Sequence, residues 1–402
     1  MDRYLLTVLD AQSRDERQML LLSGARQVGK TSLTRDLGKR AALACYLNWD
    51  VLSDRSLIAA GPRRVAEYCG LDTLREERTY VAFDELHRYP DWRGFLKGLF
   101  DAYQDRGRFI VTGSAALRTF RRGGDSLMGR YFPYTLHPLS VAELVSAAAV
   151  GPGERAPGKV TAEAWDHLLR FGGFPEPFLR GEQRFYNRWR RLRTEQLLRE
   201  DLRDLTRIQE LDQVELLALS LARQVGQLSN HSGLARQCQV SVDTVRRWVS
   251  TLEGLYYCFR VPPLQANVAR ALRKQPKYYL WDWSLVDDPG ARFENMVASA
   301  LKKAVDYWTD AGYGTLALYF VRDKEGNEVD FCVTRDGSPW LLVEAKLGES
   351  AGLSQALYRF SEKLSVPLAL QVVRDSAFVD ADCFAQRGPI RVPARTFLSQ
   401  LV

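Results

Sequence analysis

The sequence predicts an α/β protein that begins with a parallel sheet wrapped by helices. Across residues 1–150, short apolar runs alternate with amphipathic stretches, which is the pattern of such a sheet. A glycine-rich loop after the first run and an acidic pair after the third support this fold class. The runs expected to form strands are Met19 to Leu22, Ala44 to Asn48, Tyr80 to Phe83, Arg108 to Thr112 and Arg130 to Thr135.

The glycine-rich loop, residues 24–31, reads GARQVGKT and fits the phosphate-binding pattern GxxxxGK[ST]. Glycines let backbone amides close around a phosphate, Lys30 is placed to reach the β and γ phosphates, and Thr31 offers a hydroxyl to Mg²⁺. The pattern therefore predicts a nucleoside triphosphate and Mg²⁺ as ligands. The expected nucleotide contacts are Gly24, Ala25, Arg26, Gln27, Val28, Gly29, Lys30, Thr31 and Ser32.

The acidic pair follows the apolar run of residues 80–83, as expected at the carboxyl end of a buried parallel strand. Asp84 would hold Mg²⁺ through water, and Glu85 would orient or deprotonate the water that attacks the γ phosphate. A core strand that ends in two solvated acids is the structural alternative. The phosphate-binding pattern upstream favours the functional interpretation.

Composition leaves the class open but excludes some functions. With 402 residues, 46% of them hydrophobic and 26% charged, the chain can form two to four globular domains. No run approaches the length of a membrane span, and residues 1–10 lack the apolar core of a secretion signal, so we expect a cytoplasmic protein without membrane contact. Six cysteines without a CxxC pair favour reduced, buried thiols over a disulfide or zinc framework.

A formal net charge of +7 is compatible with DNA binding through phosphate contacts. Basic residues cluster locally, although each cluster could equally be a solvated helix face. These clusters are Arg188, Arg190, Arg191 and Arg193; Arg236, Arg246 and Arg247; and Arg270, Arg273, Lys274 and Lys277.

Glycine and proline residues at 151–158 indicate a domain boundary. We expect a phosphate-loop ATPase domain at 1–150, a helical lid at 151–205, a winged-helix-like domain at 206–290 and a small α/β domain at 291–402. Within the third of these, residues 234–248 suggest a helix-turn-helix in which Ser241 caps the second helix. Such modules read DNA in some proteins and serve only as packing or lid domains in others.

A second constellation of acids lies near the carboxyl end. Asp330 lies in EVDFCV, Glu344 and Lys346 lie in LLVEAK, and Glu294 lies on an amphipathic stretch. With Asp330 and Glu344 holding Mg²⁺ and Lys346 positioning water, this set could hydrolyse a phosphodiester. The alternative is two ordinary surface acids beside a lysine.

Register constrains this second hypothesis. Residues 335–338, RDGS, predict a hairpin turn between the two strands. A two-residue loop at Asp336 and Gly337 would pair Asp330 with Val343 and turn Glu344 to the other face of the sheet. The nuclease hypothesis therefore requires an odd loop or a bulge centred near Gly337.

Several segments together resemble a family of bacterial and archaeal AAA-like ATPases that carry a carboxyl-terminal domain of unknown function, number 4143. The matching segments run in order to about residue 350. They are GARQVGKTSL, YLNWD, VAFDELHRYPDW, VTGSAALR, LMGRYFPYTLHPLS, FGGFPEP, REDLRDL, PKYYLWDWSLVDD, RFENMV, EVDF and VEAK.

The resemblance implies a nucleotide-hydrolysing module, a helical and winged-helix middle, and a terminal domain with a restriction-endonuclease-like fold. Lys30, Thr31, Asp84 and Glu85 match the family's ATP-site residues. Ser114 matches a polar sensor of the γ phosphate. Arg130 matches an arginine that could stabilise the transition state, within the chain or across to a neighbour in a homo-oligomer. His87 stands where relatives often show Gln, and it would relay nucleotide state or simply cap the strand.

These observations predict a cytoplasmic Mg²⁺-dependent ATPase coupled to DNA binding or cleavage, with the terminal domain a metal-dependent nuclease or its relic. The first alternative is a nucleotide-dependent switch or scaffold whose terminal domain is catalytically inactive. A motor that translocates on DNA is the third reading, and the chain shows no helicase motif beyond the nucleotide site.

Overall fold

The structure is a computed structural model that describes residues 2–113, 127–202, 210–265, 275–349 and 352–402. The chain forms two compact units. The first contains residues 1–137 with 147–149, and the second contains residues 138–146 with 150–402.

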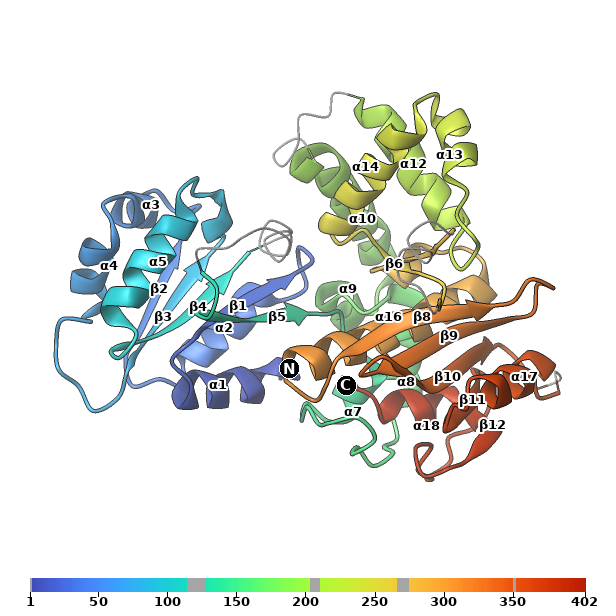
Figure 1. Cartoon of the computed structure of the whole chain (residues 1–402). Coiled ribbons are helices and arrows are strands. Elements are labelled where there is room, and N and C mark those ends of the chain that lie inside the picture. Colours follow the sequence, from blue (N-terminus) through green and yellow to red (C-terminus); the bar gives the residue numbers. More distant parts are fainter. Residues whose placement is uncertain (1, 114–126, 203–209, 266–274, 350–351) are drawn as a thin grey trace. The chain divides into compact units, whose positions relative to one another are not determined.

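The first unit is built on a five-stranded parallel sheet with the order β2-β3-β4-β1-β5, which confirms the predicted fold class (Figure 1). Every expected run forms a strand, because each is apolar and pairs with a neighbour along its length. The strands are β1 (Met19–Gly24), β2 (Ala44–Asn48), β3 (Thr79–Asp84), β4 (Gly107–Thr112) and β5 (Tyr131–Leu136).

Helices cover both faces of this sheet (Figure 1). The alternate residues Leu21, Val81, Phe83, Phe109 and Val111 face α3 (Leu52–Ala59), α4 (Pro62–Cys69) and α5 (Trp92–Tyr103) in one continuous core. Helices α1 (Leu5–Asp15) and α2 (Lys30–Gly38) pack on the other face. Because all strands are parallel, their carboxyl ends meet at one edge, where the loops after β1 and β3 lie.

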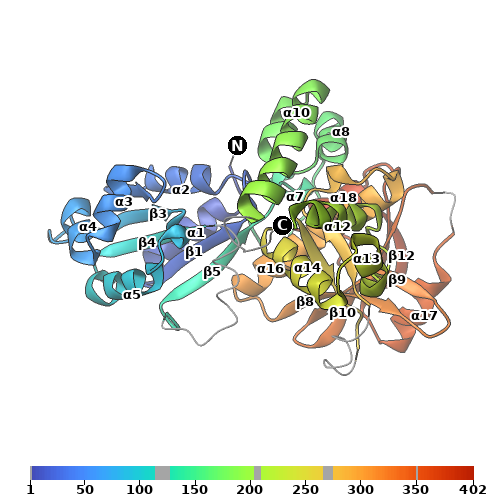
Figure 2. The ribbon, with the colours of Figure 1, turned by 90° about the horizontal axis from the view of Figure 1, so that it is seen from above.

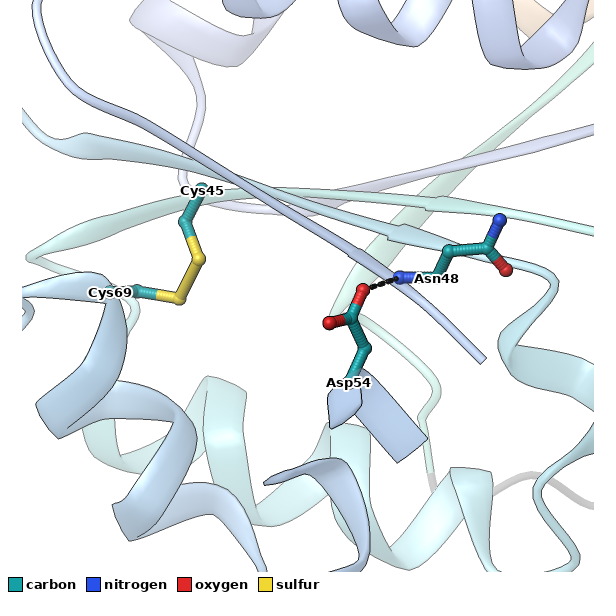
Figure 3. The surroundings of a disulfide bond; sticks show 4 residues. All are labelled: Cys45, Asn48, Asp54 and Cys69. Atoms are coloured by element: carbon teal, nitrogen blue, oxygen red, sulfur yellow. Dashed lines mark hydrogen bonds between the residues drawn. A yellow bond between two sulfur atoms is a disulfide. The ribbon is translucent and has the colours of Figure 1, made fainter. Parts of the chain in front are cut away.

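Cys45 and Cys69 form a disulfide, so the expectation that all cysteines are reduced thiols is wrong for this pair (Figure 3). The bond joins β2 to the end of α4, and nearby the carboxylate of Asp54 accepts a hydrogen bond from the amide of Asn48 (Figure 3). No pattern in the sequence indicates this pairing, because it depends on the end of α4 meeting β2 in the folded unit. The other four cysteines, Cys238, Cys258, Cys332 and Cys383, are buried and free, as expected.

Reducing this disulfide should destabilise the first unit. The bond closes a loop across a sequence separation of 24 residues, and loops of this length contribute about 2–4 kcal/mol to stability. We expect dithiothreitol to lower the thermal midpoint of the wild type. The double variant Cys45→Ser with Cys69→Ser should already have the lower midpoint and should not respond to the reductant. Equal midpoints for oxidised and reduced wild type would contradict this prediction.

The second unit begins with a helical part. Its helices α12, α13 and α14 lie together in both views, and β6 pairs antiparallel with β7 (Figures 1 and 2). Ser241 caps α14 as predicted, accepting a hydrogen bond from the amide of Thr244. The elements are α7 (Val141–Val145), α8 (Ala162–Phe171), α9 (Pro175–Arg180), α10 (Gln183–Glu195), η3 (Gln196–Asp201), α12 (Leu211–Arg223), α13 (His231–Cys238), α14 (Val242–Gly254), β6 (Cys258–Val261), β7 (Lys277–Leu280) and η4 (Trp283–Leu285).

The carboxyl-terminal part of this unit is a five-stranded mixed sheet with the order β12-β11-β10-β9-β8. Helix α17 packs on one face through Leu357 and Phe360, and the long helix α16 packs against β8, β9 and β10 (Figure 1). The elements are α16 (Pro289–Asp310), β8 (Leu316–Arg322), β9 (Glu328–Arg335), β10 (Ser338–Lys346), α17 (Gln355–Lys363), β11 (Leu368–Val373), β12 (Gly388–Pro393) and α18 (Ala394–Ser399). No helix among the described residues is long and apolar enough to span a membrane.

Candidate nucleotide site and acidic cluster

The loop between β1 and α2 follows a path that requires its glycines. Gly24 has φ +152°, and a Cβ on it would lie 2.5 Å from the carbonyl oxygen of Leu136. Gly29 has φ +101° and begins α2 without a side-chain cap. A helix amino terminus that follows a glycine and has no side-chain cap suits a phosphate.

Lys30 is buried within this loop. Its Nζ donates hydrogen bonds of 2.9 Å to the carbonyl oxygens of Gly24 and Ala25. Both acceptors belong to the loop itself, so the ammonium lies inside the turn that we expect to enclose the phosphates. The chemistry of the loop fits an anion, because it combines the amino terminus of a helix with a cation.

Asp84 receives hydrogen bonds on both carboxylate oxygens. Thr31 and Tyr46 donate to Oδ2 at 2.8 and 2.5 Å, and Thr112 donates to Oδ1. The structure therefore brings together Thr31 and Asp84, the two groups expected beside Mg²⁺. A hydroxyl next to a carboxylate is an oxygen set that fits this ion.

Sequence reasoning missed Tyr46 and Thr112. Thr112 ends the fourth expected strand, and parallel order alone places that end beside Asp84. Tyr46 is a different case, because it lies in the middle of β2 and only the packing of the sheet brings its hydroxyl to Asp84. Burial and the hydrogen bond to Asp84 raise the pKa of Tyr46 well above its usual value, so it stays a proton donor.

Glu85 follows Asp84 in a left-handed conformation, with φ +54°. Burial raises the pKa of this carboxyl, against the lowering effect of Lys30. The Nδ1 of His87 lies 3.6 Å from the Oε2 of Glu85. Burial, with Arg88 and Lys30 adding to it, lowers the pKa of His87 to about 4, so the imidazole is neutral at physiological pH. Glu85 is therefore placed as a carboxylate whose proton affinity is higher than that of an exposed glutamate, which suits a general base.

Two predicted residues are not brought to this site. Ser114 lies outside the described residues. Arg130 precedes β5, and its carbonyl oxygen pairs with the amide of Met19, at the amino end of β1. The phosphate-binding loop lies at the other end of β1, about 20 Å away for a six-residue strand. Arg130 instead pairs with Asp101 of α5 at 2.7 Å, so it does not act on the nucleotide of its own chain in this arrangement.

The second constellation depends on the hairpin between β9 and β10. Asp336 and Gly337 both have positive φ and form a two-residue loop, since Arg335 pairs with Ser338. This loop alone would put the acids on opposite faces.

A bulge restores the register. The pairing shifts between Pro339 and Leu341, so the extra residue is Trp340 rather than a residue near Gly337. Val343 then pairs with Phe331, and the same register continued by one residue sets Glu344 opposite Asp330. β9 also has an irregularity against β8 between Cys332 and Val329, which bends the strand at Asp330.

An unexpected lysine occupies the centre of this acidic cluster. The Nζ of Lys277, on β7, lies 2.5 Å from Glu328, 3.8 Å from Glu294 and 4.0 Å from Asp330. Its side chain is 3% exposed. The hydroxyl of Tyr279, also on β7, donates to Glu294 at 2.6 Å. In the sequence, Lys277 belongs to a basic cluster that could be a solvated face. A solvated position is wrong for Lys277, because β7 is buried against α16 and β9.

Excess negative charge remains around this lysine. Burial, and then Asp330, raises the pKa of Glu294 to about 7. Burial also raises the pKa of Asp330. Burial lowers the pKa of Lys277, but Glu294 and Asp330 raise it by more, so the ammonium stays charged.

Glu344 and Lys346 pair with each other at 2.7 Å on the same strand. Lys346 also interacts electrostatically with Asp330 and Glu294. Within the described ranges, no group of three or more His, Cys, Asp or Glu side chains is arranged to hold a metal ion. The carboxyl-terminal cluster as built thus holds lysine ammonium groups where we expected Mg²⁺, and it does not fit the metal without displacement of Lys277.

Three family models match consecutive parts of the chain. Residues 16–145 match an AAA domain, residues 162–288 match domain of unknown function 8612, and residues 289–382 match domain of unknown function 4143. The chain therefore contains an AAA domain at its amino end and a domain of the 4143 family at its carboxyl end.

Two relatives of the chain are uncharacterized proteins. An uncharacterized protein of Mycobacterium tuberculosis is 28% identical over 82% of this chain and 72% of its own length. An uncharacterized protein of Methanocaldococcus jannaschii is 24% identical over 65% of this chain and 60% of its own length. Among solved structures, the Walker-type ATPase of Pyrococcus abyssi is 15% identical, with a TM-score of 0.43 over 71% of this chain and 94% of that one. AMPPCP-bound DnaA of Aquifex aeolicus is 13% identical, with a TM-score of 0.31 over 61% of this chain and 86% of that one.

Proposed function

We propose that the protein binds ATP with Mg²⁺ and hydrolyses it at the loop between β1 and α2. The observation that carries this proposal is the 2.8 Å hydrogen bond from Thr31 to Asp84, directly beside the loop that encloses Lys30. Mg²⁺ would be held by Thr31 and, through water, by Asp84, and it would neutralise charge on the β and γ phosphates.

The remaining steps, binding of the triphosphate and activation of water, would be carried out by residues of the chain. The loop amides and Lys30 bind and orient the triphosphate. Tyr46 and Thr112 fix the carboxylate of Asp84 in one orientation. Glu85 accepts a proton from the attacking water, and its raised pKa supports that role.

Lys30→Ala tests the site. We expect it to remove most ATP affinity, because the loop loses its cation, and filter binding with labelled ATP measures this. Lys39→Ala is the matched control, since Lys39 lies at the exposed end of the same helix and pairs only with Asp36 among the described residues. ATP binding that survives in Lys30→Ala at the wild-type level would refute the proposal.

We also propose that nucleotide state is coupled to DNA binding through a winged-helix-like domain. Helices α12, α13 and α14 with the β6–β7 pair support this domain, and α14 exposes Arg246 and Arg247. Steep loss of DNA binding between low and high salt would support it, since phosphate contacts release counterions. The position of Arg130 favours a homo-oligomer, in which this residue would serve the nucleotide of a neighbour. The alternative remains an ATP-dependent switch or scaffold with an inactive terminal domain.

Phosphodiester cleavage at the carboxyl-terminal cluster is a second candidate function, and it would require displacement of Lys277 before a metal ion could bind there. The observation that favours it is the bulge at Trp340, which sets Glu344 opposite Asp330 with Lys346 nearby. Nicking of plasmid DNA by the wild type, and its loss in Asp330→Ala and Lys346→Ala, would support cleavage. Intact plasmid with all three proteins would favour the switch or scaffold.

A further inference from the structure

Helices α10 and α12 of the second unit, with η3 between them in the chain, enclose a pocket of about 670 Å³. Pockets of about 300–1,000 Å³ are typical of small-molecule sites. This pocket lies apart from the acidic cluster, and none of the roles assigned above uses its residues.

The two walls are helix faces. On α10 and its continuation η3, the lining residues recur every three or four positions and so lie on one face; they include Asn187, Arg191, Thr194, Leu198 and Arg199. On α12 the lining residues Glu215, Leu219 and Ala222 recur in the same way. Tyr257 and Leu285 complete the lining.

The pocket offers a cation for an anionic ligand. Arg199 is already paired with Glu215 at 3.3 Å and Asp212 at 3.9 Å, and Arg190 hydrogen bonds with Tyr186. Arg191 is exposed and makes no ion pair with any residue in the described ranges. Two adjacent arginines at one rim can face a doubly charged group, which a phosphate monoester is near neutral pH.

A second observation marks the same place. η3 is a π-helix over residues 196–201 that continues α10, and its Leu198 and Arg199 line the pocket. π-Helical turns are rare and occur frequently at functional sites. The helix therefore departs from α geometry where the pocket is formed.

Apart from the arginines, the lining combines apolar side chains with the polar Asn187 and Thr194 and the acidic Glu195 and Glu215. Leu198 and Tyr257 are buried, and Leu219 is 49% exposed although it is a large apolar side chain. An inorganic ion would leave this surface without a partner, whereas a ring system would cover it. The carboxylate of Glu195 could accept hydrogen bonds from amino or hydroxyl groups of the same ligand.

We propose that this pocket binds a nucleotide unit, with its phosphate against Arg191 and its base against Leu219 and Leu198. The unit could be a free nucleotide or part of a single strand, because both present the same phosphate and base. The proposal concerns a site other than the phosphate-binding loop and does not rest on ATP hydrolysis.

The test uses the full chain with Lys30→Ala, so that the loop between β1 and α2 does not contribute. Binding of methylanthraniloyl-AMP and of a fluorescein-labelled thymidine tetranucleotide is followed by fluorescence anisotropy. Saturable binding of the first probe indicates a free nucleotide, and binding of the second alone indicates a strand. Binding of neither probe below about 1 mM overturns the proposal, as that corresponds to only about 4 kcal/mol.

Variants locate the binding. Arg191→Glu should lower the affinity for the probe at least about tenfold, because it replaces a charge-assisted contact with repulsion. Leu219→Asp should weaken binding of the same probe as well, because it places a charge in the apolar wall that we expect the base to contact. Arg188→Glu is the matched control, since Arg188 is exposed on the same helix and does not line the pocket. Equal loss in Arg188→Glu and Arg191→Glu would also overturn the proposal, because it would show a general charge effect.

Discussion

Glu85→Gln should leave ATP binding intact and lower the turnover number by about 10²–10⁴, the usual contribution of a general base. Gln has the same shape and tolerates the neighbourhood of Asp84 without adding charge. It cannot accept the proton of the attacking water. Steady-state phosphate release measures the turnover number, and filter binding of labelled ATP measures affinity in the same preparations.

Matched variants separate this role from a general effect on the fold. Glu76→Gln removes an exposed acid from the same unit and should leave both measurements unchanged. His87→Gln tests the neighbour of Glu85. Since His87 is neutral, it should change the rate far less than Glu85→Gln. Phosphate release by Glu85→Gln within about threefold of wild type would show that another group activates the water.

Sequence was sufficient to place the candidate nucleotide site, because its parts are local. The loop needs glycines at fixed spacing before a lysine, and the acids need an apolar strand before them. Both signals lie within eight consecutive residues. The place of Thr112 beside Asp84 could also have been predicted, because its strand was expected and the carboxyl ends of parallel strands meet at one edge of the sheet.

Contacts between segments that are distant in the sequence could not be predicted from local patterns, because they depend on how those segments pack. Cys45 reaches Cys69 only because α4 lies along β2. The bulge was required by the register argument, yet its place at Trp340 depends on how β10 packs, because the turn itself is a regular two-residue loop. Arg130 was assigned its role by position alone; the structure places it at the amino end of β1, away from the loop of its own chain, and its role toward a neighbouring chain stays a prediction.

Lys277 is the most consequential residue that the sequence did not single out. It follows a run of basic residues, and nothing local distinguishes it from them. The antiparallel pairing of β6 with β7 and the packing of α16 bury it among acids that come from two other elements. Its role is therefore a property of the folded second unit.

Lys277→Met should destabilise the second unit by about 3–5 kcal/mol, because removal of one partner leaves buried charges without compensation. Glu294, Glu328 and Asp330 would then repel one another in a site from which water is largely excluded. Urea unfolding followed by tryptophan fluorescence measures the loss. Lys346→Met is the comparison, since its side chain is 39% exposed and its ion pair should contribute less.

The same variant tests whether the ammonium stands where a divalent cation could bind. With Lys277 removed, three carboxylates remain as oxygen ligands, and a cation that binds only the folded state raises stability. We expect millimolar Mn²⁺ or Mg²⁺ to raise the thermal midpoint of Lys277→Met and to leave the wild-type cluster unaffected. No nucleotide is added, and the loop between β1 and α2 is the same in both proteins, so any response of that site to the ions is common to both and cancels in the comparison. Adding Glu294→Gln to Lys277→Met should recover part of the stability and abolish the response to metal, since one charge and one ligand are lost together. A wild-type chain that gains as much from the metal as Lys277→Met would show instead that the lysine and the cation occupy different places.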